Sequence, residues 1–414
     1  MLDLNFIREN KALVKKSLER RGVDIDIENL LKIDEKRRQL IQEIENLRKE
    51  KNEISVDQEN RDIDQAKAIK SDLLKKEPEL KKIKEEIDAI LLSLPNIPDS
   101  EVPDGKDEED NKVIRKWGTP KEFNFPFKDH LTLGKDLDII DMERGAKVSG
   151  SGFYYLKNEA ALLEMALMQF TINKIQEKGF QFFIIPNLVK EGAMIGTGFF
   201  PAEENEIYKI DKDNLYLIGT AEVGLASYHA DEIIEEKKLP LHYSAFSSCF
   251  RREAGAYGKV ARGVFRVHQF NKIELFVISR PEDSEQEHQK LVEISEEILR
   301  DLKLPYEVVI NCVGDLGFPN RKRYDINTWM PYWKGYKETH SASNDGDFQA
   351  RRLNLRYRTD DSKIKYCHTL NNTAIASPRI IVAILENYQL EDGTVNVPEV
   401  LRPYLKFKEI LPKL

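Results

Sequence analysis

The chain joins two segments of very different composition, and this boundary constrains the fold more than any other feature. Residues 1–94 contain one aromatic side chain, Phe6, and only two residues that disfavour helices, Gly22 and Pro78. Aromatic side chains supply much of the buried area of a globular core, so the first segment has little material for such a core. The sequence therefore predicts an N-terminal helical domain at 1–105 and a larger domain at 106–414.

Two stretches of the first segment have the hydrophobic repeat of a coiled coil. Apolar residues recur at steps of three and four along 27–55 and along 66–94, which gives each helix a narrow apolar stripe. Such a stripe cannot form a core alone, and the polar stretch 56–65 separates the two helices. We therefore expect an antiparallel two-helix coiled coil roughly 40 Å long, with a kink or one lost hydrogen bond at Pro78. The stripe residues are Ile33, Leu40, Ile44, Leu47, Ile54, Ile69, Leu73, Leu80, Ile83, Ile87, Ile90 and Leu94.

Charge leaves three interpretations of this coiled coil open: a structural spacer, a dimerisation element, or an arm that grips a large partner. The whole chain has a formal net charge of −8, which argues against general coating of nucleic acid. Residues 32–51 and 67–86, however, each hold seven basic and five acidic residues. A solvated helix surface explains such charges, and so does binding to a phosphate backbone.

Several classes of protein are disfavoured by what the sequence lacks. No apolar run approaches the roughly 18 residues needed to span a bilayer, and the N-terminal residues do not form a signal peptide. The cysteines Cys249, Cys312 and Cys367 are far apart in the sequence. This spacing fits a reducing compartment and predicts neither a disulfide framework nor a zinc site. We expect a cytoplasmic protein that does not bind membranes.

The second segment begins with a connector rich in proline and acidic residues and then alternates helical with strand-like stretches. It lacks the glycine-rich motifs of Rossmann and P-loop nucleotide sites. The predicted fold is therefore α+β, with helices flanking an antiparallel β-sheet. Helices are predicted at 159–178 and 283–303, and strands at 180–186, 215–219, 265–278 and 306–311.

Polar residues gather in three clusters of this domain. In the first, Thr220 and Glu222 are two residues apart at the end of an apolar run. On a strand, these two side chains would face the same space; exposed polar groups at a strand end explain the pair as well.

The second cluster, at 247–276, consists of two strand-like runs joined by a glycine-rich loop. Charges within central strands are costly unless they are paired or bound to a ligand, and arginine is well suited to phosphate oxygens. A ladder of structural ion pairs is the alternative. The charged residues considered are Arg251, Arg252, Glu253, Arg262, Arg266, Lys272 and Glu274.

The third cluster, at 337–358 and beyond, adds oxygen ligands and another arginine. Glu338 and Ser341 offer oxygen atoms that suit Mg²⁺ beside a phosphate, and Arg379 begins an apolar helical run. A ligand could meet the guanidinium at that helix N-terminus. From the residues alone, the domain is predicted to bind a phosphorylated, nucleotide-like ligand with a small polar companion.

In order and spacing, these clusters resemble the motifs of class II aminoacyl-tRNA synthetases, specifically of the seryl-tRNA synthetase family, over essentially the whole chain. The segment EKGFQFFIIPNLV resembles motif 1, FRREAGAYGKVARGVFRVHQF motif 2, and NNTAIASPRIIVAILENYQ motif 3. The sequence TAE at 220–222 matches the serine-binding signature of the family. NNTA stands where some members have a Gly-Ser-Gly turn, so Thr373 would replace the serine hydroxyl of that turn.

The resemblance implies a serine–tRNA ligase with a serine site, an ATP site and Mg²⁺ on Glu338 and Ser341. The implied serine site comprises Thr220, Glu222, Arg251, Glu274 and Thr373. The implied ATP site comprises Arg251, Arg252, Glu253, Arg266, Val267, Phe270, Glu338, Thr339, His340, Ser341 and Arg379. The imidazole rings of His268 and His340 are expected to be scaffold.

Each part of the substrates has an implied partner. Glu274 and Thr373 would bind the serine hydroxyl, Thr220 and Glu222 its ammonium, and Arg251 both its carboxylate and the α-phosphate. On the nucleotide, Phe270 and Arg379 would sandwich the adenine ring, while Glu253 would bind the adenine amino group. Arg266 would hold the γ-phosphate, and Val267 would add backbone contacts.

The resemblance also implies partners. The coiled coil would bind tRNA(Ser), and tRNA(Sec) where a cell has one, and motif 1 would form a homodimer. No zinc is expected, because the ligands of the zinc-dependent branch of the family have no counterparts in this sequence. The alternative is a synthetase-like protein repurposed for binding or for aminoacylating a carrier protein. The intact arm, together with Arg251, Glu274 and Arg379, argues against that alternative.

Overall fold

The computed structural model describes residues 1–56, 63–253 and 263–413. It divides into two compact units, Met1–Ile97 and Pro98–Leu414, so the first unit ends shortly before the predicted boundary at residue 105. Most of the predicted glycine-rich loop, including Arg262, lies outside the described residues. Among the described residues, no helix combines the length and apolarity that a membrane span requires.

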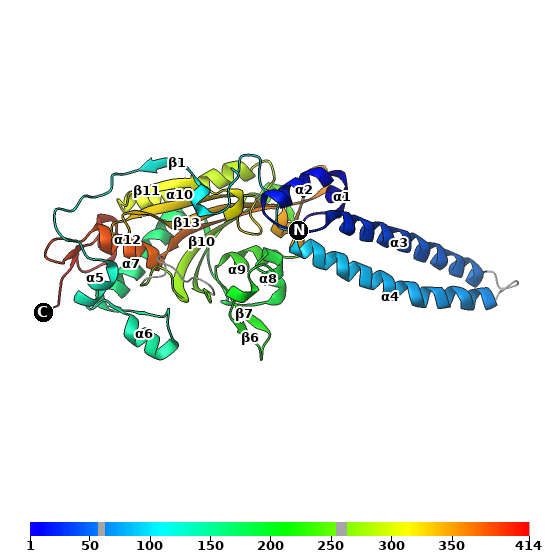
Figure 1. The fold of residues 1–414 in the computed structure, drawn as a ribbon, viewed down its shortest axis with the longest axis horizontal. Coiled ribbons are helices and arrows are strands. Elements are labelled where there is room, and N and C mark those ends of the chain that lie inside the picture. The colour runs from blue at the N-terminus through cyan, green and yellow to red at the C-terminus, as the bar shows by residue number, and fades with distance from the viewer. Residues whose placement is uncertain (57–62, 254–262, 414) are drawn as a thin grey trace. The chain divides into compact units, whose positions relative to one another are not determined.

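The first unit is a helical arm. Two short helices, α1 (Leu4–Glu9) and α2 (Lys11–Arg20), precede two long ones, α3 (Ile27–Val56) and α4 (Ile63–Ser93), which lie side by side (Figure 1). All the predicted stripe residues belong to one apolar cluster of this unit, and Nζ of Lys36 lies 2.7 Å from Oε1 of Glu79 on the facing helix. The predicted antiparallel pair is therefore confirmed. Helix α4 continues through Pro78 without interruption.

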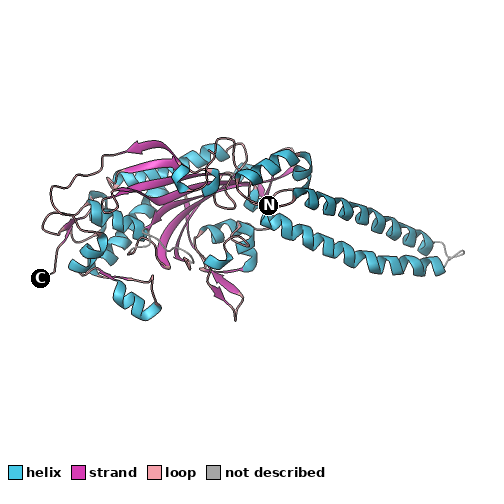
Figure 2. Cartoon of the chain, viewed as in Figure 1, coloured by secondary structure: helices cyan, strands magenta, loops and turns pink. Residues whose placement is uncertain are grey.

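The second unit is built around an eight-stranded sheet (Figure 2). All neighbouring strands pair in the antiparallel sense except β4 and β9, which are parallel. The predicted α+β fold is confirmed. In spatial order the strands are β1 (Lys112–Trp117), β11 (Tyr306–Ile310), β12 (Lys322–Met330), β13 (Gly335–Gly346), β16 (His368–Ala376), β10 (Gln269–Ser279), β9 (Leu241–Phe250) and β4 (Gln181–Ile184).

Three long helices pack on this sheet because each has an apolar face. They are α7 (Asn158–Glu177), α10 (Ser284–Asp301) and α12 (Ser377–Asn387). Leu291 of α10 and Ile381 of α12 share one buried core with Ile273 and Leu275 of β10. Both helices predicted in this domain, at 159–178 and 283–303, are present.

Shorter elements complete the unit. The helices are α5 (His130–Asp136), α6 (Met142–Ser149), α8 (Glu191–Thr197), α9 (Glu222–Ser227) and α11 (Phe348–Arg352). The strands are β2 (Ile140–Asp141), β3 (Tyr155–Leu156), β5 (Leu188–Lys190), β6 (Lys209–Ile210), β7 (Leu215–Leu217), β8 (Ile233–Glu235), β14 (Arg356–Arg358), β15 (Ile364–Tyr366), β17 (Val395–Asn396) and β18 (Glu409–Ile410).

The predicted strand geometry of Thr220 and Glu222 is wrong. Strand β7 ends at Leu217, and Glu222 is the first residue of α9. The backbone N–H of Glu222 donates to Oγ1 of Thr220 at 3.3 Å, a local side-chain to backbone hydrogen bond of the kind found in turns. The two side chains are brought together by this turn rather than by strand alternation.

Candidate active site

A cavity of about 320 Å³ is lined by β10, β12, β13 and β16 together with the starts of α9 and α12. It gathers the predicted site residues with two exceptions among those described. Arg252 is exposed, and its backbone N–H donates to the Glu206 carbonyl. His340 is fully buried, and its Nδ1 lies 2.9 Å from Oγ1 of Thr339. Both side chains lie outside the lining.

Strand register brings the predicted residues of β10 and β16 together. Phe270, Lys272 and Glu274 are spaced by two residues on β10, and all three line the cavity, as strand alternation requires. Glu274 is the direct cross-strand neighbour of Thr373 on β16. Two residues far apart in the sequence thus meet at one wall of the cavity.

A β-bulge on β13 accounts for another pair. Glu338 and Ser341 both line the cavity, although side chains three residues apart face opposite sides of a regular strand. In the register with β12, Ile326 pairs with His340 and Asn327 pairs with Glu338, so Thr339 is an additional residue. The bulge therefore turns Glu338 and Ser341 to the same face.

One end of the cavity, which we call the acidic end, contains Glu222 and Glu274. Nζ of the buried Lys272 lies 2.5 Å from Oε2 of Glu274. Glu222 instead accepts a hydrogen bond from an uncharged amide, with Nε2 of Gln349 at 2.6 Å from its Oε1. Burial raises the pKa of Glu222 to about 8, with the carboxylates of Asp345 and Glu274 acting in the same direction.

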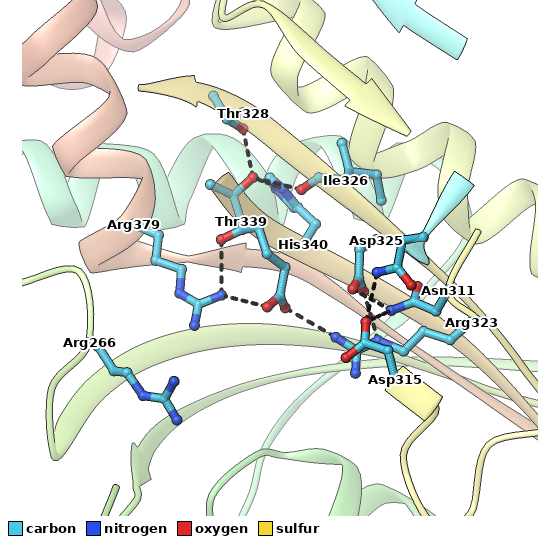
Figure 3. A network of polar contacts seen from close by, with 12 residues as sticks. Arg266, Asn311, Asp315, Arg323, Asp325, Ile326, Thr328, Thr339, His340 and Arg379 are labelled. Carbon is cyan, nitrogen blue, oxygen red and sulfur yellow. Dashed lines mark hydrogen bonds and ion pairs between the residues drawn. The ribbon is translucent and has the colours of Figure 1, made fainter. Parts of the chain in front are cut away.

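The other end, which we call the cationic end, surrounds Glu338 with arginines. Nη1 of Arg379 lies 3.2 Å from one carboxylate oxygen of Glu338, and Nη2 of Arg323 lies 3.3 Å from the other (Figure 3). Burial by itself would raise the pKa of Glu338. The charges of Arg379, Arg323 and Arg251 outweigh burial and lower that pKa to about 2.

A second layer of polar groups holds Arg323 in place. Its Nε donates to Oδ1 of Asp325 at 2.7 Å, and the other oxygen of Asp325 accepts from Nδ2 of Asn311 at 2.7 Å. The same amide of Asn311 lies 2.7 Å from Oδ2 of Asp315 (Figure 3). The cationic end is thus fixed by a connected network rather than by single side chains.

Aromatic rings accompany the arginines. The guanidinium of Arg251 lies 5.5 Å from the ring centroid of Phe270, and that of Arg379 lies 5.1 Å from the ring of Phe265, within the range of cation–π attraction. Phe270 and Arg379, the predicted adenine sandwich, both line the cavity. The predicted nucleotide ligands Glu253 and Arg266 form an ion pair.

Sequence reasoning missed several residues of the site. Lys272 is one of the strand charges without an implied role, although its two-residue spacing from Glu274 places both side chains on the same face of a strand. Arg323 and Asn371 line the cavity, and Gln349 binds Glu222. No local pattern identifies these three, because their partners are distant in the sequence or on other elements.

The side chains present fit a magnesium ion only together with a ligand that brings further oxygens. Glu338 is ionised and Ser341 supplies a hydroxyl, which gives two hard oxygen ligands, whereas Mg²⁺ prefers six. In the described part of the chain, no three His, Cys, Asp or Glu side chains converge as metal ligands. A triphosphate would have to complete the coordination.

Comparison with known proteins identifies the family. Residues 1–98 match the seryl-tRNA synthetase N-terminal domain, and residues 207–388 match the class II tRNA synthetase core domain (G, H, P, S and T). A serine–tRNA ligase of Dictyoglomus turgidum is 45% identical over 424 aligned residues, which cover all of both chains. The chain belongs to the seryl-tRNA synthetases. It is accordingly an aminoacyl-tRNA ligase.

Solved structures of the family agree with this assignment. The seryl-tRNA synthetase of Pyrococcus horikoshii complexed with ATP superposes with a TM-score of 0.95 at 44% identity, and the two chains cover each other fully. The cytoplasmic serine–tRNA ligase of Naegleria fowleri in complex with AMP gives a TM-score of 0.90 at 31% identity, over 100% of this chain and 99% of that one. The resemblance noted in the sequence to the seryl-tRNA synthetase family is confirmed.

Proposed function

We propose that the cavity activates L-serine with ATP to form seryl-adenylate, and that the enzyme then transfers the seryl group to the 3′ end of tRNA(Ser). The observation that supports this most directly is the different set of side chains at the two ends, carboxyl groups at one and arginines at the other. A carboxylate-lined end suits an ammonium and a hydroxyl, and an arginine-lined end suits a triphosphate. Arg251 lines the same cavity and matches both the serine carboxylate and the α-phosphate.

Activation requires positioning and charge stabilisation rather than a dedicated acid or base. A carboxylate oxygen of serine attacks the α-phosphorus and forms the acyl–phosphate bond. The bond from the α-phosphorus to the oxygen bridging it to the β-phosphate breaks, and pyrophosphate leaves with that electron pair. Arg251 offsets the charge that develops on the α-phosphate, while Arg266 and Arg379 hold the rest of the nucleotide.

A bound Mg²⁺ would supply charge neutralisation at the phosphates. Glu338 and Ser341 would hold it, sharing it with phosphate oxygens. The arginines around Glu338 keep this carboxylate ionised over the whole working pH range. The chain thus offers an anionic oxygen ligand at neutral pH.

Serine selectivity follows from the neighbouring Glu274 and Thr373. A substrate without a hydroxyl, such as alanine, leaves these buried polar groups unpaired, and sites of this type reject such analogues strongly. Threonine adds a methyl group and must be excluded by the size of the cavity. Discrimination against alanine is therefore expected to exceed discrimination against threonine.

Transfer consumes the adenylate. The terminal ribose hydroxyl of the tRNA attacks the seryl carbonyl carbon, an ester bond forms, and AMP leaves. The net basic stretches of α3 and α4 support a role for the arm in gripping the tRNA. We extend the proposal to tRNA(Sec), where a cell has one, as the resemblance to the family implies.

The exposed apolar surface near motif 1 supports a homodimer. Leu162 and Met165 on α7 and Ile184 on β4 are all more than half exposed, and β4 is at an edge of the sheet. A second copy of the chain would bury these side chains. Ile184→Lys combined with Met165→Lys is expected to shift the protein to the monomer in light-scattering measurements.

ATP–pyrophosphate exchange with each of the twenty amino acids tests the activation step. Exchange is expected with serine, weakly with threonine and least with alanine. If serine supports no exchange, the proposed enzyme activity is wrong, and the repurposed synthetase becomes the better explanation.

Deletion of the coiled coil tests the transfer step separately. Replacing residues 31–93 by a short linker is expected to leave serine-dependent exchange nearly unchanged and to abolish charging of tRNA(Ser). If the shortened protein still charges tRNA at the full rate, the arm is not the tRNA-binding element.

A further inference from the structure

Gln349 lies directly behind the acidic end and has no role in the function proposed above. It is on α11, is fully buried, and does not belong to the cavity lining. Its Nε2 donates to Oε1 of Glu222 at 2.6 Å and to the backbone carbonyl of Thr197 at 3.2 Å. Its Oε1 accepts from Oγ1 of Thr369 at 2.8 Å.

These partners fix the orientation of the amide. Glu222 and the Thr197 carbonyl are acceptors, so the two hydrogens of the Gln349 amide must point at them. The amide oxygen then faces the Thr369 hydroxyl, which can donate. Each hydrogen-bonding group of the amide has a partner. A flipped Gln349 would turn its amide oxygen, which is an acceptor, toward the two acceptors Glu222 and the Thr197 carbonyl.

The two glutamates of the acidic end are therefore held in different ways. Glu274 is paired with the ammonium of Lys272 at 2.5 Å, so its charge is largely cancelled before a substrate arrives. Oε1 of Glu222 instead accepts from a neutral donor, the amide of Gln349. A neutral donor fixes a carboxylate without supplying the positive charge that would compete with an incoming ammonium.

We propose that Gln349 is a positioning residue that orients the Glu222 carboxylate toward the ammonium group of the amino-acid substrate, with Thr369 locking the amide. Gln349 acts through Glu222 and touches no substrate. This inference rests on the proposed function, because it assigns the ammonium of serine to Glu222. Lys272, by contrast, leaves Glu274 to accept a hydrogen bond from the uncharged hydroxyl.

The test measures ligand affinity with and without the ammonium group. The probes are 5′-O-(N-seryl)sulfamoyladenosine, a stable mimic of seryl-adenylate, and the analogue in which hydrogen replaces the amino group. Gln349→Leu is expected to weaken binding of the seryl compound about 10- to 100-fold, as for loss of a hydrogen bond to a charged group. Binding of the deamino compound is expected to change less than about threefold, because it makes no use of Glu222.

A second variant distinguishes loss of positioning from a general loss of folding stability. Thr369→Val keeps the shape of the side chain and removes only the donor to Gln349. This variant is expected to weaken binding of the seryl compound about three- to tenfold, and to leave binding of the deamino compound nearly unchanged. In exchange assays, both variants are expected to raise KM for serine and to leave KM for ATP unchanged.

Gln42→Leu is the matched control, because it makes the same chemical change at an exposed residue of α3 that does not belong to the cavity lining. It is expected to alter neither affinity. Equal weakening of both probes by Gln349→Leu and Thr369→Val would overturn the inference and show a structural role only. Failure of the proposed function is distinguishable, since the unmodified enzyme would then show no serine-dependent exchange.

Discussion

Two glutamates in one cavity, Glu222 and Glu338, have opposite electrostatic surroundings. Glu222 lies beside the carboxylates of Glu274 and Asp345, and its pKa is raised to about 8. Glu338 lies among Arg379, Arg323 and Arg251, and its pKa is lowered to about 2. Burial acts in the same direction on both, so the sign of the neighbouring charges decides the outcome.

The difference shows how one cavity can prepare for two ligands of opposite charge. An ammonium can pair with Glu222, which a neutral amide holds, whereas phosphates can join Glu338 as partners of Arg379 and Arg323. Preorganised groups of this kind favour the ligand because they need not be reoriented on binding.

Removing the hydroxyl-binding glutamate should give the largest effect at the acidic end. Glu274→Ala leaves Lys272 as a buried cation without its partner and leaves the serine hydroxyl without its acceptor. We expect kcat/KM for serine in pyrophosphate exchange to fall roughly 10³-fold, and the melting temperature to fall because a buried pair is broken.

Glu274→Gln separates these two effects, since it keeps the volume and one hydrogen-bond acceptor. Glu399→Ala, which removes a surface partner of Lys303, should change neither quantity. An unchanged KM for serine in both Glu274 variants would remove this residue from the serine site.

A neutral side chain at the cationic end tests the other half of the comparison. Glu338→Gln removes the charge shared by Arg379 and Arg323, together with the proposed magnesium ligand. We expect kcat/KM for ATP to fall about 10²-fold, while KM for serine stays within about twofold. Exchange kinetics with each substrate varied in turn measure both, and equal changes in the two KM values would contradict the independence of the ends.

The pH dependence of substrate binding should differ between the ends. Glu222 must be ionised to bind an ammonium, and the groups facing it are Asp345, Glu274, Lys272 and Gln349. Because its pKa is raised, the ionised fraction falls as pH drops below about 8. We expect 1/KM for serine to rise roughly tenfold per pH unit up to that value.

The cationic end provides the internal control for the pH dependence of 1/KM for serine. The pKa of Glu338 lies far below the assay range, so this carboxylate adds no pH dependence to ATP binding between pH 6 and 8. Steady-state exchange at constant ionic strength gives both profiles. If 1/KM for serine is as independent of pH as ATP binding is expected to be, protonation of Glu222 does not control serine binding.

The smallest expected effect concerns the charge behind Glu222. Asp345→Asn removes one of the carboxylates that raise the pKa of Glu222, so the rise of 1/KM for serine should move to lower pH. At pH 7 we expect KM for serine to fall roughly two- to fivefold, the effect of a fraction of a pKa unit. A shift to higher pH would contradict the direction of this coupling.

The sequence predicted the coiled coil of the arm and part of the cavity, for physical reasons. The apolar stripe from Ile33 to Leu94 is a local repeat in the sequence. It predicts a helix because side chains three and four residues apart lie on the same helix face. Glu222 and Glu274 were placed in one site through the resemblance to a family, whereas strand alternation gave the wrong local geometry for Thr220 and Glu222. The turn there contains a hydrogen bond from the Glu222 backbone to the Thr220 hydroxyl, which an alternation pattern does not predict.

The sequence did not predict the residues whose partners are distant in the chain. Gln349 contacts Glu222 across 127 positions of sequence, and no spacing rule reaches that far. Arg323 meets Glu338 only because β12 pairs with β13. Such contacts are properties of the register between strands and of the packing of short helices, neither of which is encoded in a local pattern.

The additional residue on β13 makes the length of this strand part of the chemistry. With Thr339 present, the number of residues between Glu338 and Ser341 is even, and both side chains still face the cavity. Deleting Thr339 would leave Glu338 and Ser341 two residues apart in regular pairing with β12, and strand alternation would then place both side chains on one face without a bulge. What the additional residue supplies is the local bend and twist of β13, so this deletion is expected to disturb the direction of the two oxygens rather than the face on which they lie.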